Sequence, residues 1–187
     1  AHLGSMNRAA SRLILGKFDE GQVRDTAQEL REELGAAPNV AVAFVSNSYG
    51  TDLDEFQEVV AVHGHTPMLA GCTGSGLIGT GREAELSEGF SLLFLHIPEA
   101  RLRAVPLAQS QLEASRGPAF WQDAAGEPPE AWLALANPFR FDADNWLQEW
   151  NTAFPGVPVL GGLASGARGD EDVTVFGPGV GQTSDAL

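Results

Sequence analysis

The sequence predicts a mixed α/β domain with a largely parallel sheet, built from two duplicated β-α-β units with helices packed on the sheet. Residues 41–76 and residues 131–166 both contain an apolar strand, an asparagine loop, an acidic helix start, an amphipathic helix, a proline-led strand and a Gly/Ser/Thr turn. Asn47 and Asn137 fall at the same place in the two segments. A strand, a helix and a second strand in succession are typical of a crossover that joins parallel strands.

The second half of the repeat aligns when one extra residue is allowed before its proline. Gly71 then aligns with Gly162, which puts Leu163 at the place of Cys72. Two such halves tend to bring equivalent loops to a shared axis, so we expect a ligand to lie between the two Gly/Ser turns.

Composition indicates one folded domain with an acidic surface. The 187 residues are 43% hydrophobic and 19% charged, and the formal net charge is -14. Such a charge repels polyanions, so nucleic acid and anionic membranes are not expected partners. No apolar run approaches the roughly 20 residues that cross a bilayer. The single cysteine fits a reducing compartment, and we expect a cytoplasmic protein.

Residues 1–6 are expected to be a cloning remnant, and residues 7–187 to form a single domain. The first helix is predicted over 19–34, because Asp19 can cap its start and Gly35 can end it. The β-branched, apolar run 40–46 predicts a strand that is buried on both faces.

The helix of each repeat begins in an acidic segment. Asp52 and Glu55 have the spacing of a capping box, and Phe56 and Val60 lie four residues apart on the face expected to be buried. Two tryptophans take those positions in the second copy, and helical spacing opposite a strand favours core packing over a cofactor-stacking role. These tryptophans are Trp146 and Trp150.

Further strands are predicted over 90–97, 102–107 and 172–176, with a short helical or irregular stretch around 111–125. Gly74, Gly76 and Gly79 match a dinucleotide fingerprint letter for letter. The following residues 80–89 are short and polar and do not predict the helix that this fingerprint needs. Dinucleotide binding is therefore disfavoured, and no Gly-Lys-Ser/Thr follows that would make a P-loop.

Cys72 could act as a nucleophile with a histidine partner, or it could be a small buried apolar residue at a turn. The second interpretation is favoured, because Leu163 takes the equivalent place in the alignment. His63 and His65 could offer two imidazoles to a metal, but neither a cysteine nor a carboxylate pattern accompanies them. No metal site and no cofactor are expected.

The two Gly/Ser turns are rich in backbone N–H groups and short hydroxyls. Such a surface suits a small polar ligand with a carboxylate, which Arg82 could pair with. The alternative is that these glycines only make tight turns between strands. The candidate ligand-binding residues are Asn47, Cys72, Thr73, Ser75, Arg82, Asn137 and Ser165.

The motif PMLAGCTGSGLIG over residues 67–79, followed by Gly81-Arg82-Glu83, closely resembles the N-terminal region of FIST domains. The motif PVLGGLASG over residues 158–166 resembles the second Gly/Ser turn of that family, and the resemblance extends over residues 12–176. It implies a non-catalytic sensory module of intracellular signalling proteins that binds small ligands such as amino acids or other carboxylic acids. The partners it implies are a signalling output domain or the C-terminal FIST region.

Two other classes of function remain open from the sequence. A hydrolase-like or thiol enzyme would use Cys72. A protein-interaction or assembly module would need no small ligand and would present an exposed apolar patch.

Overall fold

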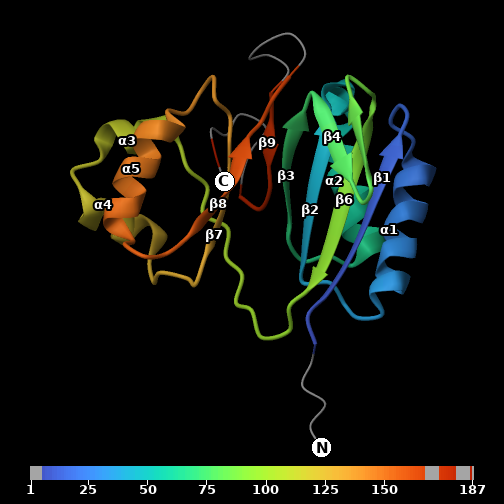
Figure 1. Cartoon of the computed structure of the whole chain (residues 1–187), viewed down its shortest axis with the longest axis horizontal. Coiled ribbons are helices and arrows are strands. Elements are labelled where there is room, and N and C mark those ends of the chain that lie inside the picture. The colour runs from blue at the N-terminus through green and yellow to red at the C-terminus, as the bar shows by residue number, and fades with distance from the viewer. Residues whose placement is uncertain (1–5, 167–172, 180–185, 187) are drawn as a thin grey trace, which may run out of the picture.

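Figure 1 shows the computed structural model of the chain, which describes residues 6–166, 173–179 and 186. A larger part contains a five-stranded sheet backed by two helices, and a smaller part beside it contains a two-stranded sheet and three helices (Figure 1). Within the described residues, no helix has the length and apolar character needed to cross a bilayer.

The larger sheet has the strand order β1-β6-β2-β3-β9. Only the pairing of β2 with β3 is parallel, and the other three pairings are antiparallel. The expectation of a largely parallel sheet is therefore wrong. The cause is that β3 runs into a hairpin instead of a second crossover helix, so β6 returns antiparallel between β1 and β2. The five strands are β1 Arg8–Leu15, β2 Val40–Ser46, β3 Leu69–Gly74, β6 Gly89–His96 and β9 Val175–Phe176.

Helices α1 (Glu20–Leu34) and α2 (Leu53–Gly64) cover one face of this sheet. The predicted ends of α1 are confirmed: the Asp19 carboxylate accepts a bond from the Gln22 amide at 2.7 Å, and Gly35 ends the helix at φ 61°. The inner face of α2 is confirmed as well, because Phe56 and Val60 are fully buried.

The predicted capping box at the start of α2 is wrong. A 3-10 helix, η1 (Asn47–Asp52), fills the space between β2 and α2, and the Asp52 side chain makes no capping bond. The chain is already turning helically when it reaches Asp52, so this residue does not have the extended backbone of an N-cap.

The Gly-rich segment continues as the hairpin of β4 (Gly76–Gly79) and β5 (Arg82–Glu85). This hairpin lies against the face of the larger sheet opposite to α1 and α2. Ser91 Oγ donates to the carbonyl oxygen of Ile78 at 2.8 Å and ties this hairpin to β6. Because the glycines enter strands and no helix starts there, the segment lacks the geometry of a dinucleotide cradle.

The smaller part pairs β7 (Trp132–Ala136) with β8 (Val159–Leu163) in parallel, joined by α5 (Ala143–Ala153). Helices α3 (Gln109–Ala114) and α4 (Pro118–Ala125) complete it. Trp146 and Trp150 are 5% and 2% exposed in its core, as predicted.

The predicted strand 102–107 is wrong, because this segment forms the connection between the two parts, and its one β-bridge among the described residues joins Leu107 to Ala186. The predicted strand 172–176 is present only as β9, Val175–Phe176. Residue 172 lies outside the described residues.

Both segments of the sequence repeat fold as strand, helix and parallel strand, but they lie in two separate sheets and do not build one. Their origin by duplication stays a prediction. Counted from Asn47 and Asn137, which directly follow β2 and β7, Cys72 corresponds to Gly161 and not to Leu163. The sequence alignment therefore places the second strand of the second copy two residues too far along the chain. The cause is that the register of a parallel pair is set by the strands and not by the connecting loop.

Candidate functional site

The two β-α-β units meet where their second strands end. Ser165, just beyond β8, accepts a hydrogen bond at its Oγ from the Ser75 amide at 3.0 Å, and the two hydroxyls lie 3.2 Å apart. The Ser165 amide donates to the Thr73 carbonyl at 3.1 Å, and the Asn47 side-chain amide donates to the Ser165 carbonyl at 3.2 Å. Four of the seven predicted residues therefore form one hydrogen-bonded cluster, which we call the junction.

Asn137 lies beside the junction and reaches it through the segment that leads into β9. Its side chain is 1% exposed, donates to the Val173 carbonyl at 3.1 Å and accepts from the Phe139 amide at 3.0 Å. The next residue, Thr174, donates from its amide to the Thr73 hydroxyl at 3.0 Å. Asn137 thus fixes the loop after β7 and the segment before β9 together.

Cys72 is buried beneath the junction among Leu135, Ala164, Val173 and Val175. Burial raises the pKa of its thiol to about 12, so the thiolate that nucleophilic chemistry requires is not formed at neutral pH.

The histidines next to this segment in sequence turn toward α1. His63 lies against Gln28 at 3.3 Å, and His65 lies against Arg31 at 2.8 Å. Among the described residues, no group of three or more His, Cys, Asp or Glu side chains is placed to hold a metal ion.

Arg82 is not brought to the junction. It lies on β5 opposite Gly79, at the far end of the hairpin from Ser75, and its guanidinium donates to the Leu13 carbonyl at 3.1 Å. A ligand at the junction would therefore not meet this guanidinium in the structure.

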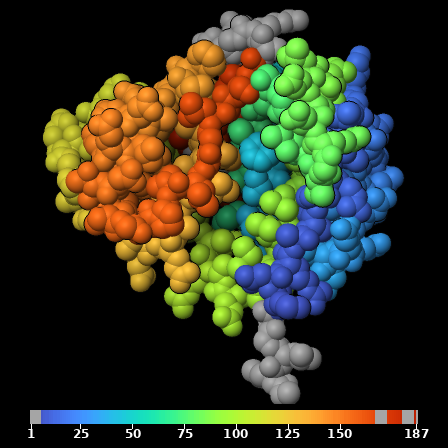
Figure 2. Space-filling model, in the orientation of Figure 1, coloured from blue at the N-terminus to red at the C-terminus, as the bar shows by residue number. Residues whose placement is uncertain are grey.

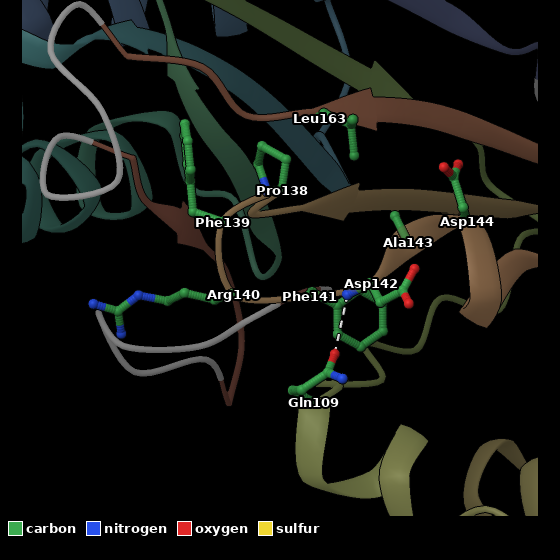
Figure 3. Close-up of a pocket in the computed structure, with 9 residues that line it drawn as sticks. All are labelled: Gln109, Pro138, Phe139, Arg140, Phe141, Asp142, Ala143, Asp144 and Leu163. Carbon is green, nitrogen blue, oxygen red and sulfur yellow. Dashed lines mark hydrogen bonds between the residues drawn. The ribbon is translucent and has the colours of Figure 1, made fainter.

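An open hollow of about 450 Å³ lies next to the junction, at the carboxyl ends of β7 and β8 and the start of α5 (Figure 3). The space between the two Gly/Ser turns is itself taken up by their mutual hydrogen bonds. The hollow is lined by Gln109, Pro138, Phe139, Arg140, Phe141, Asp142, Ala143, Asp144 and Leu163.

The hollow combines groups of both charges with apolar surface. Figure 3 shows the Arg140 side chain at one end and the Asp144 carboxylate at the other, with Leu163 and Pro138 on the β-strand side. Asp142 caps α5 by accepting a hydrogen bond from the Asn145 backbone amide at 3.1 Å.

Two contacts hold the wall of the hollow in place. The Asp142 amide donates to Gln109 Oε1 at 3.0 Å, which ties α3 to the start of α5 (Figure 3). Ring packing of Phe141 on Trp146, with centroids 5.9 Å apart, connects the wall to the aromatic core.

None of the residues that line the hollow was among the predicted ligand-binding residues. A signal was present: ligands of open α/β sheets bind at the carboxyl ends of parallel strands, and residues 138–141 follow the strand β7. The contribution of Gln109 had no such signal, because it comes from a helix outside the repeat.

The comparisons with known proteins decide the family. A FIST N domain model matches residues 39–186, which is most of the chain. This chain belongs to the FIST N domain family.

FIST domains are sensory domains of signal transduction. The family match agrees with the resemblance carried by the two Gly/Ser turn motifs, and these two turns meet at the junction. The FIST N chain is 26% identical over 154 residues to uncharacterized proteins from two strains of Mycobacterium tuberculosis, CDC 1551 and H37Rv. The match covers 81% of this chain and 39% of each relative, so the chain spans well under half the length of these relatives. No solved structure gives a significant match.

Proposed function

We propose that this FIST N domain is a non-catalytic, small-ligand-sensing unit of a signal-transduction protein, and that its ligand occupies the hollow at the start of α5. The observation that supports this most is the position of the hollow. It adjoins two chain segments that reach the larger part of the molecule through hydrogen bonds, so a ligand there is placed to affect how the two parts are held together.

The first segment runs from Leu163, which lines the hollow, to Ser165, two residues further on. Ser165 holds Ser75 and Thr73 through the bonds of the junction. A ligand that moves Leu163 therefore moves the residue that joins β8 to β3.

The second segment runs from Pro138 and Phe139, which line the hollow, to Asn137. The Asn137 side chain bonds both the Phe139 amide and the Val173 carbonyl, and the adjacent Thr174 bonds Thr73. Both routes end at Thr73. A binding event in the hollow thus has two short covalent and hydrogen-bonded paths to the larger part.

The lining favours an amino acid whose side chain carries a positive charge. Arg140 can pair with a carboxylate at one end of the hollow, Asp144 can pair with a side-chain cation at the other end, and Leu163 and Phe139 offer apolar contact to the ligand. Phe139 is 58% exposed, so its ring has free surface to give to a ligand. Arg140 thereby takes the role that the sequence suggested for Arg82.

A catalytic function for the same region is disfavoured by the chemistry of its one thiol. Cys72 is 4% exposed, is packed by apolar side chains and has a pKa raised to about 12. A thiol enzyme needs an accessible sulfur with a lowered pKa.

Thermal unfolding of the chain with each common amino acid at millimolar concentration tests the proposal. A ligand that binds only the folded state at one hundred times its Kd adds about 2.7 kcal/mol, which raises Tm by about 5–10 °C in a domain of this size. The four tryptophans all lie in the smaller part, so their fluorescence follows the same binding.

The variants Arg140→Ala and Asp144→Asn are expected to abolish the shift. Arg101→Ala and Asp123→Asn remove the same charges from exposed positions outside the hollow and are expected to keep it. The proposal is wrong if no amino acid raises Tm, or if a shift survives both hollow variants.

A further inference from the structure

Among the residues that the structure describes, β8 is an edge strand of a sheet with two named strands. A pair of strands is marginally stable by itself, and an open edge offers unpaired backbone groups to any other chain. The sequence of β8, Val-Leu-Gly-Gly-Leu, contains no lysine, proline or other residue that would protect such an edge. Its last four residues are all exposed.

The hydrogen-bond pattern between β7 and β8 shows which backbone groups of β8 point away from β7. At one end the Trp132 amide donates to the Pro158 carbonyl at 2.9 Å, and at the other the Ala164 amide donates to the Ala136 carbonyl at 2.8 Å. In a parallel ladder every second residue of a strand bonds the neighbour. The alternate residues of β8 therefore present their N–H and C=O groups to the outer edge; they are Val159, Gly161 and Leu163.

An apolar surface accompanies this edge. Leu133 and Leu160 are directly paired across β7 and β8 and are 53% and 66% exposed. Along the same face, Leu135 and Ala164 are buried against Cys72. Cys72 pairs in turn with Phe44 on β2, whose ring is 38% exposed.

Buried apolar residues thus lie between the exposed leucines of the smaller part and the exposed Phe44 of the larger sheet. Figure 2 shows a depression, separate from the hollow, between β8, in orange, and the β4–β5 hairpin, in green. Cyan atoms of β2 lie at the bottom of this depression. We call this region, the outer edge of β8 together with Leu133, Leu160 and Phe44, the open face.

We propose that the open face docks an apolar β-strand supplied by the part of a FIST protein that lies outside this unit, and that this strand extends the β7–β8 sheet. The Mycobacterium tuberculosis relatives have most of their length outside the matched region, since the match covers 39% of each. A strand that pairs with β8 would satisfy its outer backbone groups, and its side chains would cover Leu133 and Leu160. A second copy of this chain is disfavoured as the occupant, because each copy has a net charge of -14 and repels the other.

The open face is tested first in the 187-residue chain itself. Leu133→Ser and Leu160→Ser are expected to lower Tm by less than about 2 °C, because both side chains are exposed. Leu135→Ser is the matched control on the same strand and face, and since Leu135 is 3% exposed it is expected to lower Tm by about 5 °C or more. If Leu160→Ser costs as much as Leu135→Ser, the face is already covered within this chain and the proposal fails.

Hydrogen exchange identifies the occupant. Amides of the outer edge of β8 are expected to exchange rapidly in the 187-residue chain at every concentration. In the full-length relative from strain H37Rv, the strand before the second Gly/Ser turn is expected to exchange about 100-fold more slowly, because it is paired on both sides. Equally fast exchange in the full-length relative would overturn the proposal. Protection that appears in the 187-residue chain as its concentration rises would also overturn it and would assign the face to a second copy.

Discussion

Replacing Asn137 by alanine is expected to destabilise the fold more than any exposed asparagine would. The side chain is almost fully buried and makes two hydrogen bonds, one to the Val173 carbonyl and one from the Phe139 amide. Leaving a buried carbonyl unpaired costs about 1–3 kcal/mol, and losing the second bond costs about 1 kcal/mol more. We therefore expect a loss of about 2–4 kcal/mol in the free energy of unfolding.

Circular dichroism during heating measures this loss. About 2–4 kcal/mol corresponds to a Tm lower by about 4–16 °C in a chain of this size. Asn151→Ala is the control, because Asn151 is an exposed residue of α5, and it is expected to change the free energy by less than about 0.5 kcal/mol. Equal effects of the two substitutions would refute the reasoning, because they would mean that the bonds of Asn137 do not hold the two parts together.

Two further predictions follow from the buried thiol and from the close approach of β7 and β8. Burial raises the pKa of Cys72 from its ordinary 9.0 to about 12, so the unfolded chain loses this proton first, and stability is expected to fall as pH rises from about 9 toward 12. In urea titrations Cys72→Ala should reduce that fall, and an unchanged slope would contradict the burial. A Cβ at Gly161 would overlap the Ala134 carbonyl oxygen, whereas one at Gly162 meets open space. Gly161→Ala is therefore expected to cost more than about 2 kcal/mol in the same titration and Gly162→Ala less than about 1, and a reversed order would contradict the register.

The elements that the sequence predicts well depend on neighbouring residues. Helix α1 is one, because Asp19 and Gly35 lie at its ends and both cap it through local contacts. The strand β2 is another, because its apolar, β-branched run favours a strand, although the expected burial of both faces is wrong at Phe44, which is 38% exposed. The β-α-β order of each unit is likewise local, since a short connection favours neighbouring parallel strands.

The features that the sequence did not predict depend on residues far apart in the chain. Strand β1 pairs with β6 through contacts such as Ala10 with Phe94, and nothing near residue 10 indicates that partner. The separation of the two units into different sheets follows from this pairing, because β1 and β6 complete the larger sheet.

The candidate site is divided in the same way. Thr73, Ser75 and Ser165 belong to motifs that could be found in the sequence, and the structure brings them together. The hollow needs Gln109 from α3 and Leu163 from β8 to lie beside the loop after β7, and only the tertiary packing does this. Arg82 had suitable chemistry, but the hairpin places it at the wrong end.

Amide NMR of the labelled chain, titrated with the amino acid that gives the largest Tm shift, tests most directly whether a ligand in the hollow acts on the junction. The account predicts chemical-shift changes in residues 139–144 and Leu163, and with them at Ser75 and Ser165. Changes that leave Ser75 and Ser165 unmoved, or that gather on the exposed surfaces of α1 and α2, would contradict it.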